Sequence, residues 1–369
     1  MGRQTDLAQP LRVLTIPPTT KLPSFQIGIE QPFNELRRQG VIDYTVMAEH
    51  EVSEQTIAAS DVIVFLRNTQ PEAYEKLELA HAFGKRTVYS IDDNFLELSP
   101  QRGFGMVMAE PERRETVSRF LRDAQTIRVG APYFADYIRK HFNPRVVCIR
   151  GSVDFSWLDR AKGQTRNPRE LVIGYGGTNK EHDFAVVVPA LKQIAEEYGK
   201  RIRLEFHGFA PAQLLGHPRV VLFVCSMEYR DYLHFLRQRA WDIGLAPLED
   251  TSSNRCKADN KFREYSACGI PGIYSRIPPF SDCVEHERTG LLVAHHTEAW
   301  YQAIKRMLED EELRRTIREN AGRYVRERYT IERCASEWWK HIFEDEGGNG
   351  RDEIGFGLRC EQADGLHRH

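Results

Sequence analysis

The sequence predicts an α/β protein of two Rossmann-like, doubly wound domains that face each other across a cleft. Short apolar runs alternate with helical patterns along the chain, as strands and helices do in proteins with parallel sheets. A polar stretch at residues 159–170, typical of an interdomain linker, interrupts this alternation once before it restarts. The chain has 369 residues and a hydrophobic content of 41%, which is enough for two separate cores.

Each half is expected to contain a parallel sheet whose strands are the short apolar runs. The N-terminal strands are expected at residues 11–16, 61–66, 86–91, 126–129 and 145–149, and the C-terminal strands at 171–175, 202–206, 220–224, 242–246, 270–274 and 290–293. A helix over 184–198 has one apolar face and tolerates Pro189 only in its first turns. We place the N-terminal domain at 1–160 and the C-terminal domain at 161–330, and expect the tail at 346–369 to be loosely ordered.

Composition and charge exclude several classes of protein. The net charge of −2 argues against a general nucleic-acid-binding protein, which needs a surplus of Lys and Arg. Seven cysteines without a C-x-x-C pair are typical of free thiols in a reducing compartment, and the sequence indicates no metal site. The chain starts without the apolar core of a signal peptide and has no apolar run near the roughly eighteen residues that span a bilayer, so a cytoplasmic location is expected.

A predicted helix carries four arginines, namely Arg113, Arg114, Arg119 and Arg122. They could give a weak peripheral membrane contact, but a solvated helix face is the favoured interpretation. No oligomeric state is predicted.

The most informative segment runs from Asn254 to Pro271. Lys257, Lys261 and Glu264 are spaced at i, i+4 and i+7, so on one helix they would project from one face. Two ammonium groups suit a diphosphate, and a carboxylate beside them can accept hydrogen bonds from ribose hydroxyls. A solvated face with one intrahelical ion pair is the alternative. Because the segment lies between two short apolar runs and follows a strand, a binding site at the carboxyl end of the sheet is favoured.

A glycine-rich loop at residues 174–178 carries a second functional signal. A strand runs into Gly176, Gly177 and Thr178 before a helix, so backbone N–H groups and the helix dipole can face an anion. Lys180 could add a charge toward the diphosphate. The alternative is an ordinary strand-to-helix turn in which Asp183 is the N-cap.

The ends of two further strands are expected to form a wall for a nucleobase. Residues 206–209 and 225–229 lie there, including Met227 and Tyr229, although ordinary packing of these two side chains is an equal alternative. Opposite them, Asp92 and Asp93 follow an N-terminal strand. One of the two is expected to meet the acceptor hydroxyl as a basic or orienting group, with Arg67 beside them; an N-cap for the next helix is the alternative.

These residues carry a resemblance. The run Glu264-Tyr-Ser-Ala-Cys-Gly-Ile-Pro271 is similar to the E-A-x-A-x-G-x-P segment of the large GT-B glycosyltransferase family with the E-x(7)-E signature, also described as glycosyltransferase group 1 or family 4-like. Segments that agree with that family and its polysaccharide-assembly branches cover most of residues 11–343: Val88 to Phe95, Ile173 to Thr178, Val284 to Val293, and Glu298 to Trp339.

The resemblance implies a GT-B fold whose last helix, at 331–345, crosses back onto the N-terminal domain. It implies a metal-independent, retaining hexosyltransferase that uses a nucleotide-diphosphate sugar as donor and has no cofactor. Its acceptor would be a saccharide, lipid-linked or small-molecule hydroxyl. The donor would lie against Gly176, Gly177, Thr178, Lys180, Met227, Asn254, Lys257, Lys261 and Glu264, with Lys257, Asp92 and Asp93 as catalytic candidates. The segment 19–27 resembles the acceptor-side loop and brings Ser24 and Gln26 toward the cleft.

One position departs from the family signature. Eight residues before Glu264, where the family has its first glutamate, this chain has Cys256. Asn254 or Lys257 is expected to occupy that space. Two other functions stay open because of this departure: a nucleotide-sugar-binding scaffold or partner subunit without transfer activity, and a sugar-nucleotide epimerase.

Overall fold

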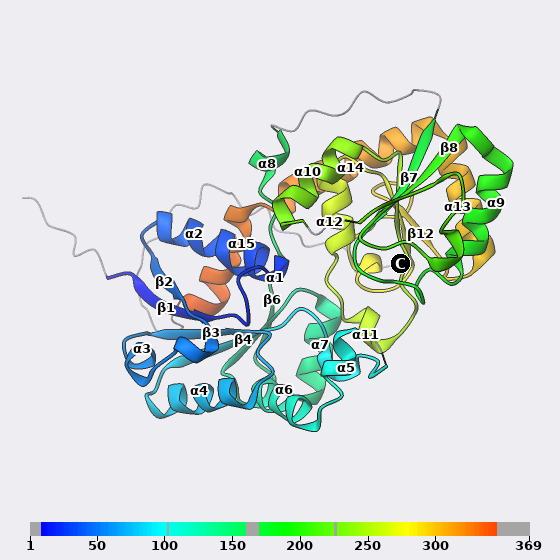
Figure 1. The fold of residues 1–369 in the computed structure, drawn as a ribbon. Coiled ribbons are helices and arrows are strands. Elements are labelled where there is room, and N and C mark those ends of the chain that lie inside the picture. The colour runs from blue at the N-terminus through cyan, green and yellow to red at the C-terminus, as the bar shows by residue number, and fades with distance from the viewer. Residues whose placement is uncertain (1–8, 102, 160–169, 225–226, 345–369) are drawn as a thin grey trace, which may run out of the picture.

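Two parallel six-stranded sheets form the framework of the protein (Figure 1). The computed structural model describes residues 9–101, 103–159, 170–224 and 227–344. The predicted α/β fold of two Rossmann-like halves is therefore confirmed. The tail at 346–369 and all but the first and last residues of the predicted linker lie outside the described residues. Residues 160 and 161, where we placed the domain boundary, lie outside them too.

The N-terminal sheet has the strand order β2-β1-β3-β4-β5-β6, and every neighbouring pair is parallel. Helices cover both faces. Figure 1 shows α2 and α15 on one face and α4 and α6 on the other. The bounds are β1 Leu11–Ile16, β2 Ile42–Val46, β3 Val62–Leu66, β4 Arg86–Ser90, β5 Thr126–Val129, β6 Val146–Cys148, α2 Gln31–Arg38, α3 Glu54–Ala58, α4 Pro71–Ala82, α6 Pro111–Asp123, α7 Pro132–His141 and α15 Ile331–Trp338.

The C-terminal sheet has the order β12-β11-β10-β7-β8-β9 and is also parallel throughout. One face packs against α9 and α13, and the other against α10, α12 and α14. The bounds are β7 Leu171–Gly176, β8 Ile202–His207, β9 Val220–Phe223, β10 Ile243–Ala246, β11 Gly272–Ser275, β12 Leu291–Val293, α9 Val187–Tyr198, α10 Tyr229–Arg239, α12 Asn260–Ala267, α13 Thr297–Glu309 and α14 Glu311–Arg328.

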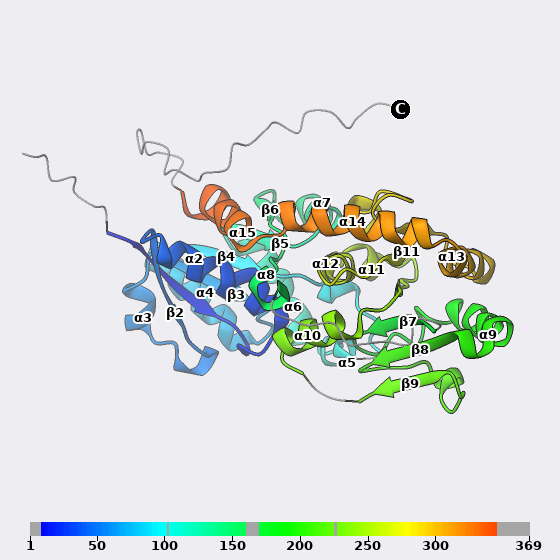
Figure 2. The same ribbon diagram turned by 90° about the horizontal axis from the view of Figure 1, so that it is seen from above.

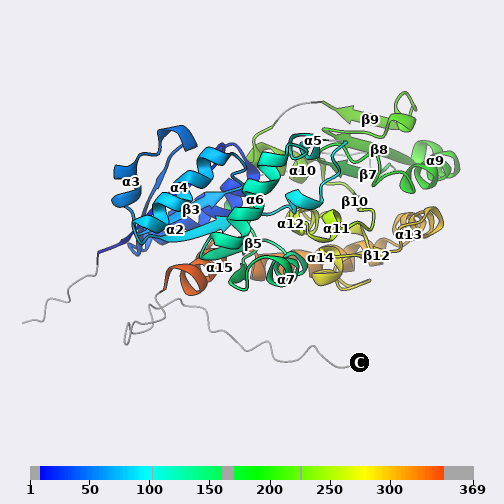
Figure 3. The ribbon, with the colours of Figure 1, turned by 90° about the horizontal axis from the view of Figure 1, so that it is seen from below.

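Short helices and helical turns lie between the longer elements of both domains. Figure 3 shows the helices of the N-terminal domain from below, with α4 and α6 in front of the sheet. The short α-helices are α1 Pro23–Phe25, α5 Phe104–Val107, α8 Phe155–Asp159 and α11 Ser252–Arg255; π-helical turns cover Gln26–Glu30 and Trp339–Phe343; 3₁₀ turns cover Glu49–Glu51, Phe95–Glu97, Gly199–Arg201, Ala212–Leu214 and Phe280–Asp282.

The last helix returns to the N-terminal domain, as the resemblance predicted. In Figure 2, α14 runs along the C-terminal domain and α15 continues beside α2. The buried Trp338 donates from Nε1 to the backbone oxygen of Gly28 at 2.8 Å, and its ring meets Phe33 edge-on with centroids 4.9 Å apart. A large aromatic side chain that buries its surface and satisfies its N–H is a strong anchor. This contact completes one face of the N-terminal domain with the C-terminal end of the chain.

Three local predictions were wrong. The strand β2 was missed, because its alternating, partly exposed pattern at the sheet edge lacks the continuous apolar run of the buried strands. The helix expected from residue 184 begins at Val187, after a run of turns. The segment that holds Lys257, Lys261 and Glu264 forms two short helices, α11 and α12, rather than one. Lys257 lies between them, which changes the geometry of the candidate site.

Candidate functional site

The carboxyl ends of both sheets meet across the space between the domains. The clearest contact joins the Lys257 ammonium, after α11, to the Asp93 carboxylate, after β4, with Nζ and Oδ1 3.1 Å apart. Beside it, Asn94 donates from Nδ2 to the Cys256 sulfur at 3.5 Å. Ligands of open parallel sheets bind at this edge. The structure therefore brings the predicted N-terminal and C-terminal site residues together.

An arginine holds the two acidic residues. Arg67 Nη1 lies 2.9 Å from Asp92 Oδ1, and Nη2 lies 3.4 Å from Asp93 Oδ2. Arg67 adopts a φ of +55°, a left-handed conformation that non-glycine residues rarely take, while its backbone N–H donates to Ser90 at 2.9 Å. Backbone strain of this kind is concentrated at functional sites. Neither aspartate caps the next helix, because that turn has Asn94 as its N-cap, so the N-cap alternative is wrong.

The two carboxylates have opposite pKa shifts. Burial raises the pKa of Asp92, and Arg67 only partly offsets this effect. For Asp93, burial acts in the same direction, but the charges of Lys257 and Arg67 outweigh it and hold the pKa below its usual range. Asp93 in turn raises the pKa of Lys257. Paired titratable groups whose environments separate their pKa values are typical of acid–base sites.

The break between α11 and α12 decides where the cations point. Asp259, the N-cap residue of α12, accepts a hydrogen bond from Tyr329 at 2.6 Å and pairs with Arg150 at 3.1 Å. Since Asp259 is buried, these partners fix the chain there and end the continuous helix that the spacing predicts. Lys257 lies in the connection and reaches Asp93, whereas Lys261 lies on α12. The prediction that Lys257 shares one helix face with Lys261 and Glu264 is wrong.

Lys261 and Glu264 form a compact polar cluster against the glycine loop. The Lys261 ammonium lies 2.5 Å from the Glu264 carboxylate and donates to the Tyr232 hydroxyl at 3.0 Å. Tyr232 in turn donates to the backbone oxygen of Gly176 at 3.1 Å. Glu264 is buried, so its charge is held by these partners. Tyr232 was not predicted as a site residue, because a tyrosine on a helix gives no signal that distinguishes it from core packing.

The glycine loop is shaped by close backbone approaches. A Cβ atom on Gly176 would lie 2.7 Å from the Tyr232 hydroxyl, and one on Gly177 would lie 2.7 Å from the Tyr175 hydroxyl. Gly208, at a φ of +80°, lies so close that a Cβ there would be 2.7 Å from the Gly177 backbone oxygen. Thr178 accepts through its backbone oxygen from Tyr175 at 3.1 Å. Only glycine fits the loop at these positions.

Asp183 is a polar contact and not a helix cap. Its carboxylate accepts from the Glu249 backbone N–H and from Asn254 Nδ2, both at 2.8 Å, and pairs with the Lys180 ammonium at 2.9 Å. The N-cap of α9 is Val186, without a side-chain cap, so the N-cap alternative for Asp183 is wrong. Burial and the charge of Lys257 lower the pKa of Lys180. Asp183 thus ties Asn254 to the loop that carries Lys180.

Cys256 occupies a different environment from a substrate-contacting residue. Its side chain is fully buried and belongs to the apolar cluster of the N-terminal domain. Burial raises the pKa of its thiol to about 11. The position at which the family has its first glutamate therefore serves here as an apolar contact between the domains.

The remaining predicted residues lie at the edge of this cluster. Met227 is half-buried just before α10. The His207 ring, at the end of β8, lies 5.4 Å from that of Tyr232. Ser24 is buried in α1 with an unpaired Oγ, and Gln26 begins the following π-helical turn. Among the residues that the structure describes, no hydrogen bond or ion pair joins Ser24 or Gln26 to Asp92 or Asp93, so their acceptor role stays a prediction.

The arginines of α6 are engaged within the protein. Arg113 pairs with Glu110 at 2.6 Å, Arg114 donates to the Leu96 backbone oxygen at 2.8 Å, and Arg119 pairs with Glu78 at 2.8 Å. Arg122 lies 3.9 Å from Glu115. These contacts favour the interpretation of a solvated face. Within the part of the chain that the structure describes, no helix is both long and apolar enough to cross a membrane.

The fold can now be compared with known structures. Sucrose-phosphate synthase from Thermosynechococcus elongatus superposes with a TM-score of 0.65 at 16% identity, covering 90% of this chain and 99% of that chain. HepE from Anabaena, solved in complex with UDP and glucose, superposes with a TM-score of 0.64 at 15% identity, covering 89% of this chain and 98% of that chain. The chain has the GT-B fold.

Sequence comparison adds one segment to this GT-B assignment. Residues 261–324 match the family model described as glycosyl transferases group 1, so the predicted resemblance is confirmed there. The match begins at Lys261 and includes Glu264. A UDP-N-acetylglucosamine 2-epimerase described as putative, from Listeria monocytogenes, has a lower TM-score of 0.55 at 12% identity, covering 89% of this chain and 94% of that chain. No curated protein matches the sequence.

Proposed function

We propose that this GT-B protein transfers a sugar from a UDP-sugar to a hydroxyl group of an acceptor. The observation that carries the proposal is the arrangement of Lys261, Glu264 and Tyr232 against the Gly176–Gly177 loop, directly across from the acidic pair on the other domain. The choice of UDP is supported by HepE, which has the same fold and was solved with UDP and with UDP-glucose.

The donor contacts follow from charge and position. The ammonium groups of Lys257 and Lys261 and the backbone of Gly177 and Thr178 would hold the diphosphate, and Glu264 would hold the ribose. Fixed cations stabilise the negative charge that grows on the leaving diphosphate, which is electrostatic catalysis. We therefore propose that the reaction proceeds without a metal ion.

The acidic pair would act on the acceptor. Asp92, whose pKa is raised, is the better proton acceptor for the incoming hydroxyl, because a carboxylate with a higher pKa is a stronger base than its neighbour with a lowered one. Asp93 stays ionised and would position Lys257. We propose retention of the anomeric configuration, through attack of the hydroxyl on the same face from which the diphosphate leaves, and a saccharide, lipid-linked or small-molecule acceptor, as in similar GT-B enzymes.

Calorimetric titration with UDP and GDP tests the donor site. Wild-type protein is expected to bind UDP more tightly than GDP, equally with and without EDTA. Lys261→Ala and Glu264→Ala should each weaken UDP binding by roughly 1–3 kcal/mol, the loss of a charge-assisted hydrogen bond. Lys192→Ala, which removes an exposed ammonium group from α9, is the control and should leave binding unchanged. Equal binding by all four proteins would contradict the placement of the donor.

A second assay separates transfer from its alternatives. UDP release that depends on an added acceptor, with the product's anomeric configuration followed by NMR, supports a transferase. UDP-sugar binding without turnover would instead assign the scaffold function that Cys256 keeps open. Conversion of the UDP-sugar to its epimer would assign the epimerase function.

A further inference from the structure

Both connections between the domains pass through one place. The first crossing, residues 149–154, leads from β6 to α8, and the second, residues 329–330, leads from α14 to α15. They are hydrogen-bonded to each other: the Val153 N–H donates to the Tyr329 backbone oxygen at 2.8 Å, and the Cys334 thiol donates to the Arg150 backbone oxygen at 3.3 Å. Any change in the angle between the domains must pass through these two segments.

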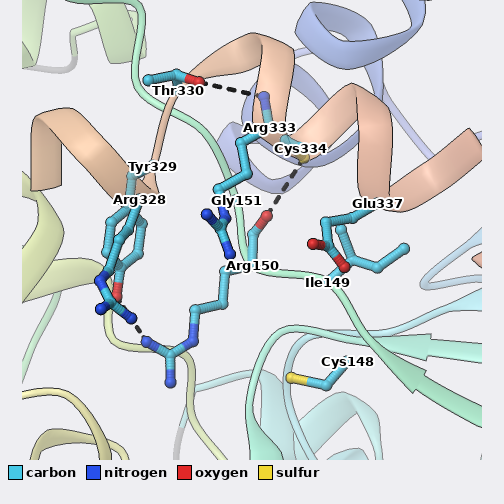
Figure 4. A pocket seen from close by; sticks show the side chains of 10 residues that line it. All are labelled: Cys148, Ile149, Arg150, Gly151, Arg328, Tyr329, Thr330, Arg333, Cys334 and Glu337. Atoms are coloured by element: carbon cyan, nitrogen blue, oxygen red, sulfur yellow. Dashed lines mark hydrogen bonds between the residues drawn. The ribbon is translucent and has the colours of Figure 1, made fainter. Parts of the chain in front are cut away.

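A cavity of about 210 Å³ lies between the two crossings, and we call it the hinge pocket. Arg150 and Gly151 line it from the first crossing; Arg328, Thr330 and Arg333 line it from the second crossing and its flanks. A single water requires only about 10–15 Å³ on the same measure, so the space holds a small organic anion. Figure 4 shows the side chains of Arg328 and Arg333 around this space, with the Arg150 guanidinium turned to the Tyr329 hydroxyl, to which it donates at 2.8 Å.

The positive charge of the hinge pocket is incompletely balanced. Arg150 pairs with Asp259 at 3.1 Å. Among the described residues, neither Arg328 nor Arg333 forms an ion pair; Arg328 lies over the Tyr324 ring at 4.8 Å, and Arg333 contributes only its backbone N–H, to Thr330. The carboxylate in the lining, Glu337, lies 3.1 Å from His341 Nε2, a contact that is an ion pair only when the imidazole is protonated. Arg328 and Arg333 are exposed, so solvent screens part of the repulsion between these guanidinium groups, and an anion between them would relieve the rest.

We propose that the hinge pocket binds a phosphate-bearing anion, either inorganic phosphate or a phosphomonoester. Guanidinium groups match the geometry of phosphate oxygens in bidentate pairs, which makes Arg a common residue in phosphate recognition. The start of α15 at Ile331, next to Thr330, adds backbone N–H groups and the positive end of a helix dipole. The site is separate from the donor site, and the proposal does not depend on the proposed transfer.

Because the hinge pocket lies between the two crossings, a bound anion would affect the angle between the domains. It would lie between Arg150 of the first crossing and Arg328 and Arg333 on the flanks of the second, so it would bind most tightly at one angle between the domains. A ligand shifts a conformational equilibrium by its difference in affinity between the two states. The anion therefore links the opening of the cleft to the supply of a phosphorylated compound.

Calorimetric titration with inorganic phosphate, and separately with glycerol 3-phosphate, tests the proposal at ionic strength held constant with chloride. Arg328→Gln and Arg333→Gln should each weaken binding about tenfold or more, since each removes a charge-assisted contact. Arg323→Gln, which removes the same charge from an exposed position on α14 outside the pocket, should leave affinity unchanged. Lys261→Gln should also leave it unchanged, which distinguishes the hinge pocket from the diphosphate site.

One further variant guards against loss of folding. Glu337→Gln removes the carboxylate from the lining and should increase affinity severalfold, a gain that a misfolded protein cannot give. Tighter binding of glycerol 3-phosphate than of phosphate identifies a phosphomonoester as the ligand, and the reverse order identifies the free ion. Absence of binding by both probes, or equal loss with Arg323→Gln, overturns the proposal.

Discussion

The Lys257 ammonium lies 3.1 Å from the Asp93 carboxylate, although the two residues come from different domains. This ion pair spans the cleft at the place where the donor diphosphate is proposed to lie. Asp93 holds Lys257 in its charged form, and Lys257 holds Asp93 ionised. A bound diphosphate would share the Lys257 ammonium with Asp93 or replace Asp93 as its partner. Donor binding and the contact between the domains therefore compete for one cation.

The opposite pKa shifts of the acidic pair predict opposite effects of pH on stability. A carboxyl whose pKa is lowered in the folded state contributes stability above its ordinary pKa of about 4, and this contribution is lost as the pH falls below that value. Asp93 is such a group. The stability advantage of the wild type over Asp93→Asn should therefore shrink when urea unfolding is measured at pH 7, 5 and 3.5.

Asp92→Asn supplies the matched comparison. The raised pKa of Asp92 means that the folded state binds the proton more tightly than the unfolded state, so its charge is destabilising at neutral pH. Relative to Asp92→Asn, the wild type should gain stability as the pH falls from 7 toward 4. If both variants respond to pH in the same direction, the assignment of the two shifts is wrong.

Removal of one hydroxyl should weaken donor binding. Tyr232 connects the Lys261 ammonium to the Gly176 backbone oxygen, and Tyr232→Phe deletes both hydrogen bonds. A roughly tenfold rise in the Kd for UDP is expected, since hydrogen bonds to charged groups are worth about 1.5–3 kcal/mol. Tyr198→Phe, which removes a hydroxyl bonded to Glu309 on the far helices, is the calorimetric control and should leave this Kd unchanged.

Two glycines with the same backbone conformation should respond differently to alanine. Gly208 and Gly216 have φ values of +80° and +83°, so either substitution costs about 1–2 kcal/mol from the left-handed conformation. At Gly216 a Cβ meets nothing within 4 Å, whereas at Gly208 it lies 2.7 Å from the Gly177 backbone oxygen. Gly208→Ala should therefore unfold at lower urea concentration than Gly216→Ala and alone should lose UDP affinity.

Restoring the family's glutamate should destabilise this chain. Cys256 lies in the apolar cluster of the N-terminal domain, so Cys256→Glu introduces a buried carboxylate beside Lys257, whose charge is already paired with Asp93. A loss of about 3–5 kcal/mol in the free energy of unfolding is expected, the cost of an unpaired buried charge. Cys256→Ser is the control: its hydroxyl can accept from Asn94, so it should lose clearly less. Equal stability of the two variants would contradict the buried position.

The sequence predicted the fold through its buried strands. Runs such as Val62–Leu66 are apolar at every position because helices cover both faces of a parallel sheet. The same signal is weak at an edge, which is why Ile42–Val46 was missed. The candidate site residues were chosen because charged side chains and glycines near strand ends have few structural reasons to be there, and their roles stay predictions.

The geometry of the site could not be predicted because distant residues determine it. The helix over 252–267 breaks where Asp259 meets Arg150 and Tyr329, partners that are remote in the chain. Local spacing carries no information about such contacts. Tyr232 and Asp183 likewise owe their positions to partners across the sheet, and the role of each is visible only when those partners are in place.

The packing of Trp338 against Phe33 also determines the order in which the protein can fold during synthesis. The ribosome releases the N-terminal strands first, but α15, which shares one of their faces with α2, is encoded after the whole C-terminal domain. Until α15 emerges, the side of Phe33 that meets Trp338 stays uncovered, and exposed apolar surface of this kind promotes aggregation. A nascent chain that stops before Ile331 would thus have an N-terminal domain that lacks one of its covering helices.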